Sequence, residues 1–68
     1  MKRAFLVQHL IRSGCELTGE ASTHSTWTNL ENDASADVAR QPEIERVDVA
    51  KICLALGIAQ PADTTPIH

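Results

Sequence analysis

Apolar and polar positions follow two different periods along the chain. Residues 2–13 place apolar side chains three and four positions apart, which predicts a helix with one buried stripe. The stripe consists of Ala4, Leu6, Val7, Leu10 and Ile11. Phe5 lies outside it and is expected to pack at its edge or to contact a partner. Gly14 then ends the helix, because glycine readily adopts the left-handed conformation of a helix C-terminus.

Three shorter segments with a period of two come next. Residues 15–18 alternate apolar and polar side chains, residues 23–28 are rich in β-branched residues around one tryptophan, and residues 35–40 form a weaker segment. Turn-forming residues separate the three segments at 19–22 and 29–33. Pro42 ends the third, since proline has no N–H to donate to a sheet. The pattern predicts an antiparallel three-strand meander.

A second helix is predicted over residues 45–57, with Gly57 at its end. Its apolar arc has two flanks, Val49, Ile52, Cys53 and Leu56 on one and Val47, Ala50 and Leu54 on the other. Either the helix is deeply buried, or one flank docks on another protein or a second copy. The candidate partner contacts are Val49, Cys53, Leu56 and Phe5. Residues 60–68, which contain two prolines, are expected to form a flexible tail after a single domain over 1–59.

The element order predicts an α+β fold, in which both helices cover one face of the sheet and leave the other face open. Side chains alternate between the faces along each strand. Trp27 is the only large apolar residue of the second strand, so its face should be the core face and His24 should lie on the open face. The same alternation assigns Ala36 and Val38 to the core, and Asp37, Ala39 and Gln41 to the open face.

Composition and charge narrow the range of functions. The 68 residues include six Lys or Arg and nine Asp or Glu, giving a net charge of −3 and a pI near 5.4. This balance argues against tight, non-specific nucleic-acid binding but leaves room for a local contact through a few cations. The apolar run at residues 4–7 is too short for a signal peptide or a membrane span. We therefore expect a cytoplasmic protein without a membrane contact, whose two cysteines are reduced thiols.

His24 is the one residue with catalytic promise, because an imidazole can accept or donate a proton near neutral pH. RNA carries its own nucleophile, the 2′-hydroxyl, so an exposed histidine can assist strand cleavage without a metal or a deep pocket. The competing interpretation is an ordinary solvated side chain. His9 is expected to be solvated on the polar side of the first helix, and His68 ends the tail. The chain has no metal-ligand spacing, so we expect no metal or other cofactor.

Four short stretches follow one another in the order and at the distances of a known family. They cover residues 10–15, 23–29, 38–44 and 50–58. The first closes a leucine-containing helix on Gly-Cys, and the second has a histidine followed three residues later by an aromatic. From Met1 to about Pro61 the chain thereby resembles the HicA-type toxins of HicA–HicB toxin–antitoxin modules. It departs from the family pattern at Ala39, where the family has proline, and at Gln41, where it has histidine.

The resemblance implies a fold like that of double-stranded-RNA-binding domains (dsRBD-like), in the order α-β-β-β-α. It implies an endoribonuclease that cuts mRNA and arrests growth, and a HicB-like antitoxin that binds and neutralises it. His24 falls at the family's catalytic histidine. The candidate substrate contacts around it are Thr23, Arg40, Gln41, Lys2 and Arg3. The alternative is a non-catalytic module of the same fold, which binds a HicB-like partner or dimerises.

Overall fold

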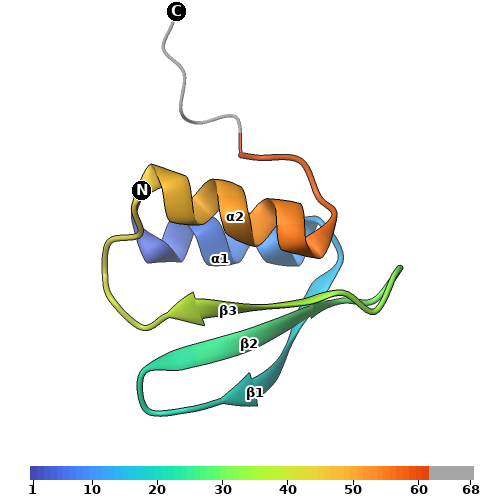
Figure 1. The fold of residues 1–68 in the computed structure, drawn as a ribbon, viewed down its shortest axis with the longest axis horizontal. Coiled ribbons are helices and arrows are strands. Elements are labelled where there is room, and N and C mark those ends of the chain that lie inside the picture. The colour runs from blue at the N-terminus through green and yellow to red at the C-terminus, as the bar shows by residue number, and fades with distance from the viewer. Residues whose placement is uncertain (62–68) are drawn as a thin grey trace, which may run out of the picture.

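The computed structural model describes residues 1–61, so the tail predicted over 62–68 lies outside the described residues. Its elements are α1 (Arg3–Arg12), β1 (Cys15–Glu20), β2 (His24–Asn29), β3 (Ser35–Ala39) and α2 (Arg46–Leu56). The two helices run in the same direction and cover one face of the sheet (Figure 1). This confirms the predicted α+β, dsRBD-like arrangement. Within the described range, neither helix is long and apolar enough to cross a membrane.

The sheet is antiparallel with the strand order β1-β2-β3, so β2 is the central strand. At its middle, Trp27 pairs with Leu17 of β1 and with Ala36 of β3. β1 is two residues longer than predicted, because a bulge between Leu17 and Gly19 lets the strand continue beyond Thr18. A side chain at Gly19 would have its Cβ 3.3 Å from the Cβ of Thr26, which explains why a glycine is tolerated inside this strand.

The hydrophobic core lies between the helices and the sheet. Its buried members are Leu6, Leu10, Cys15, Trp27, Val38, Ile44, Val49, Ile52, Cys53 and Leu56. Trp27 is only 6% exposed, which confirms its predicted place on the covered face. The stripe of α1 is narrower than predicted, because only Leu6 and Leu10, one turn apart, are buried, while Val7 is half-buried against the core. Ile11 is rotated by about 100° from Leu10 and is exposed.

The predicted partner contacts on α2 need correction. Val49, Cys53 and Leu56 are almost fully buried against the sheet, so they are core residues and have no surface to offer a partner. The exposed apolar side chains of α2 lie on its other flank, where Val47 is 55% and Leu54 is 82% exposed. Phe5 on α1 is also exposed, and its contact with a partner stays a prediction.

The C-terminal end of α2 is joined to the turn between β2 and β3. Gly57 adopts a left-handed conformation with φ of 72°, as predicted for a helix end, and the N–H of Ile58 bonds to the carbonyl of Cys53. The buried Asn29, at the end of β2, donates from Nδ2 to the carbonyl of Leu56 at 2.8 Å. This contact fixes the last turn of α2 over the sheet.

Candidate functional site

His24 is the first residue of β2, and it lies on the sheet face that the helices leave open. Exposure alternates along β2, with Ser25, Trp27 and Asn29 buried and the residues between them half-buried. The side chain of His24 is 43% exposed, and its backbone pairs with Ala39 of β3. The structure therefore places the imidazole where the strand pattern predicts it, on the side opposite Trp27.

The imidazole lies between a hydroxyl and a carboxylate. Its Nδ1 is 3.0 Å from Oγ1 of Thr23, and its Nε2 is 3.5 Å from Oδ2 of Asp37. The other carboxylate oxygen of Asp37, Oδ1, accepts a hydrogen bond of 2.9 Å from the hydroxyl of Thr26. Both ring nitrogens thus have a polar neighbour, which is the arrangement that orients a histidine for proton transfer.

Asp37 is a site residue that the sequence reasoning missed. The alternation of side chains places it on the open face, but the sequence carries no signal of its distance to His24. The register supplies that distance, because Asp37 pairs with Thr26, two residues from His24 on the same face of β2. Diagonal neighbours on one sheet face are within reach of a long or aromatic side chain, as the imidazole is here.

The rest of the open face is lined by hydroxyl groups. Oγ1 of Thr18, the residue at the bulge of β1, is 2.8 Å from Oγ1 of Thr28. Oγ1 of Thr28 is in turn 3.0 Å from Oγ of Ser35 on β3. A row of hydroxyls therefore crosses all three strands, and each group can either donate or accept a hydrogen bond. Such a surface suits ribose and phosphate oxygens without supplying positive charge.

Arg40, which follows β3, is the cation that the structure brings next to His24. Its backbone N–H bonds to the carbonyl of Thr23 at 3.0 Å. Its guanidinium donates to the carboxylate of Glu20 and to the carbonyl of Ala21. Its charge is therefore already paired with an acidic side chain across the first hairpin, and its contact with a substrate stays a prediction. Gln41 is exposed beside it.

Two other predicted substrate contacts belong to the helical layer. Arg3 is not available to a substrate, because its guanidinium donates to the carbonyl of Ala39 at 2.8 Å and to Oγ of the buried Ser25 at 3.1 Å. The prediction for Arg3 is therefore wrong, and its role is to fasten α1 to β2 and β3. Lys2 is exposed, but it lies at the start of α1, where its backbone forms a bridge with Glu43.

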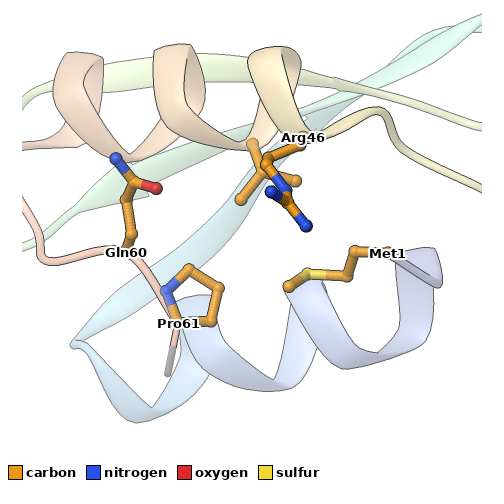
Figure 2. Close-up of a pocket in the computed structure, with 5 residues that line it drawn as sticks. Met1, Arg46, Gln60 and Pro61 are labelled. Carbon is orange, nitrogen blue, oxygen red and sulfur yellow. The ribbon is translucent and has the colours of Figure 1, made fainter. Parts of the chain in front are cut away.

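His9 is not the solvated side chain that the sequence suggests. It is half-buried, and its Nε2 donates to the carbonyl of Ala59 at 2.7 Å. The contact holds the segment after α2 against α1. The next residues, Gln60 and Pro61, were predicted to begin the tail, but they line a small cavity together with Met1, Arg46 and Val49 (Figure 2). None of these residues contacts His24, so the cavity is separate from the candidate site.

The two cysteines are buried free thiols of the core. Burial raises the pKa of Cys15, and it raises the pKa of Cys53, which the neighbouring Cys15 raises further. Their reactivity is therefore low in the folded protein, since the thiolate is the reactive form. Among residues 1–61, no cluster of three or more His, Cys, Asp or Glu side chains could hold a metal ion.

Comparison with known proteins assigns no family to the chain. No protein-family model matches it, and searches of curated proteins and of solved structures return no match either. What the site can do therefore follows from the geometry around His24.

Proposed function

We propose that the protein is a HicA-like toxin, an endoribonuclease that cuts mRNA in the cytoplasm and is neutralised by a HicB-like antitoxin. The observation that supports the activity is the exposed imidazole of His24, held between the hydroxyl of Thr23 and the carboxylate of Asp37. The four stretches that resemble the HicA-type toxins support the assignment to a toxin–antitoxin module. The reaction needs no metal or other cofactor.

The proposed reaction uses the 2′-hydroxyl of the RNA as the nucleophile. RNA lies across the open face near the turn at residues 21–23, and His24 accepts the proton of the 2′-hydroxyl. The bond between the 2′-oxygen and phosphorus forms as the bond to the 5′-oxygen breaks, and the departing 5′-oxygen takes a proton from water. The products are a 2′,3′-cyclic phosphate and a 5′-hydroxyl end. His24 then releases its proton to solvent.

The surroundings of His24 supply the substrate contacts in this proposal. The hydroxyls of Thr18, Thr28 and Ser35 face the RNA and bond to ribose and phosphate oxygens. Arg40 is the nearest cation, and a phosphate would compete with Glu20 for its guanidinium. Gln41 offers an exposed amide next to it.

The test is cleavage of a structured mRNA by the purified protein and by its His24→Ala variant. General acid–base catalysis contributes about 100- to 10,000-fold, so His24→Ala should lose at least about 100-fold in cleavage rate. The wild-type products should carry 2′,3′-cyclic phosphate ends. Induced without its antitoxin, the wild-type protein should arrest growth and the variant should not. His9→Gln is the matched control, because it changes a histidine that does not lie on the open face. A His24→Ala variant as toxic as the wild type would refute the assignment of the catalyst.

A second candidate is a non-catalytic module that binds a HicB-like partner or dimerises. The observation that favours it is electrostatic: β1, β2 and β3 contain no lysine or arginine, and Arg40 is paired with Glu20. Phosphate binding normally depends on such cations. In this case the purified protein would neither cleave nor bind RNA at low salt, while it would still bind the antitoxin.

A further inference from the structure

We propose that Asp37 is a positioning residue, which keeps the ring proton of His24 on Nε2 and so leaves Nδ1 as the atom that accepts the substrate proton. The inference rests on the proposed ribonuclease function. It goes beyond that function by naming the proton-accepting atom and the side chain that selects it.

The argument begins with what each neighbour of the ring can do. A carboxylate can only accept hydrogen bonds, whereas a hydroxyl can both donate and accept. Nε2 faces Oδ2 of Asp37 at 3.5 Å, and Nδ1 faces Oγ1 of Thr23 at 3.0 Å. A lone pair on Nε2 would point at a negative oxygen, which is unfavourable. The proton of the neutral ring therefore belongs on Nε2, and in the free protein the Thr23 hydroxyl donates to Nδ1, where the 2′-hydroxyl of a bound RNA would replace it.

The same geometry favours the protonated ring that forms during the reaction. When Nδ1 accepts a proton, the imidazole becomes a cation whose Nε2 remains 3.5 Å from the carboxylate of Asp37. Both members of the ion pair are exposed to solvent, since the side chains of His24 and Asp37 are 43% and 60% exposed. Solvent screens it, so the expected gain in rate is modest, about fivefold.

Asp37 is itself held by the sheet. Thr26 pairs with Asp37 across β2 and β3, and its hydroxyl donates to Oδ1 at 2.9 Å. The other oxygen, Oδ2, is thereby turned toward His24. Groups that orient a reacting side chain act best when they stand on regular strands, as these three residues do.

A general effect of negative charge has to be separated from positioning. Any carboxylate on the open face repels RNA, so removing one should lower KM. Glu16 is the matched control, because it is exposed on β1, pairs with Thr28 on the same face and has no contact with His24. Glu16→Ala should therefore lower KM and leave kcat unchanged. Asp37→Ala should lower KM as well, but it should also lower kcat about fivefold.

Steady-state cleavage kinetics of the purified full chain tests whether kcat falls in Asp37→Ala and stays unchanged in Glu16→Ala. Asp37→Glu should restore part of the lost kcat, because it returns a carboxylate to the same strand position. Adding Asp37→Ala to His24→Ala should cause no further loss, since the effect acts through the imidazole. If Asp37→Ala behaves like Glu16→Ala, with a lower KM and an unchanged kcat, the positioning role is wrong.

A spectroscopic measurement separates this inference from the proposed function. In the 15N spectrum of the folded protein, the neutral ring of His24 should carry its proton on Nε2. Asp37→Ala should shift both ring nitrogens, and Glu16→Ala should not. The positioning role would be overturned by a neutral ring protonated on Nδ1, or by ring 15N shifts that do not change in Asp37→Ala. Failure of the wild-type protein to cleave RNA while these signals behave as expected would instead refute the proposed function.

Discussion

Individual polar side chains bind the two layers of the protein to each other. Arg3 donates to the carbonyl of Ala39 and to the buried hydroxyl of Ser25, and Asn29 donates to the carbonyl of Leu56 at the end of α2. A buried polar group that loses its partner costs about 1–3 kcal/mol. These contacts therefore specify how the helices sit on the sheet, in addition to the apolar core.

The buried thiols predict how stability depends on pH. Burial raises the pKa of Cys53 above its ordinary value of 9.0, and the neighbouring Cys15 raises it further. In the alkaline range the folded state then binds more protons than the unfolded chain, so the free energy of unfolding falls as pH rises through the folded pKa. We expect this stabilising contribution to be complete below pH 9.0 and to decline above it.

Urea unfolding from neutral to alkaline pH measures this decline. A Cys53→Ala variant should be less stable at neutral pH, because it loses a buried side chain, but it should lose less stability as pH rises. If the wild type and Cys53→Ala lose stability in parallel as pH rises, the Cys53 thiol is not the source of the pH dependence.

The sheet face on which a side chain lies was predictable wherever it depends only on the alternation within one strand. The alternation along β2 gave the opposite placements of Trp27 and His24, because successive side chains of a strand point to opposite faces. Arg3 and Asp37 were not predictable in the same way. Their contacts depend on which residues of another element lie opposite, and that information resides in the register and the helix packing.

At the scale of elements, the ends of the helices carry the strongest local constraints. Both glycines that end them have positive φ, 90° at Gly14 and 72° at Gly57. A Cβ at Gly14 would meet no atom within 4 Å, whereas at Gly57 it would lie 2.8 Å from Nδ2 of Asn32. That amide donates to the carbonyl of Leu56 at 3.2 Å, so it cannot move without giving up the contact.

The two glycines make a matched pair of substitutions. Gly14→Ala should lower the free energy of unfolding by about 1–2 kcal/mol, the cost of a left-handed non-glycine residue. Gly57→Ala should cost about 1 kcal/mol more, because the hydrogen bond of Asn32 is lost as well. Chemical denaturation of both variants measures the difference. Equal losses in the free energy of unfolding would show that the Asn32 side chain can move away from the new Cβ without a cost.

The order and type of all five elements followed from hydrophobic periodicity, but some details did not. The bulge of β1 depends on the partner strand, since an extra residue is visible only once Leu17 and Gly19 are paired with β2. Similarly, the sequence gives α2 two apolar flanks of comparable length. Which flank faces the sheet is decided by the packing of α2, which buries Val49, Cys53 and Leu56 and leaves Leu54 exposed.

For the whole molecule, stability depends on one small core, so equal substitutions on α2 should have unequal effects. Leu56 is fully buried and Leu54 is 82% exposed. Leu56→Ala should cost about 2–5 kcal/mol, which is enough to unfold a large fraction of so small a domain. Leu54→Ala should change stability by less than about 0.5 kcal/mol. Thermal unfolding followed by circular dichroism measures both, and a fully folded Leu56→Ala variant would contradict the core assignment.

Charge is distributed unevenly between the two layers. Five of the six cations, Lys2, Arg3, Arg12, Arg46 and Lys51, belong to the helices or to the residue before α1, and only Arg40 borders the open face. Glu16 and Asp37 lie on the open face itself. Any RNA contact there should consequently be weak and sensitive to salt, and a partner with basic side chains would meet a complementary surface.

The single indole gives the protein a built-in optical reporter. Trp27 is the only tryptophan, it is 6% exposed, and within the described residues its Nε1 has no hydrogen-bond partner. Its emission should lie at short wavelength while the layers are packed and shift to the red when water reaches the ring. The ring lies on the sheet face opposite His24. Its emission should therefore report whether the core is packed and should not respond to a ligand bound on the open face. Tryptophan emission can thus show, without a label, whether a variant that lacks the proposed activity is still folded.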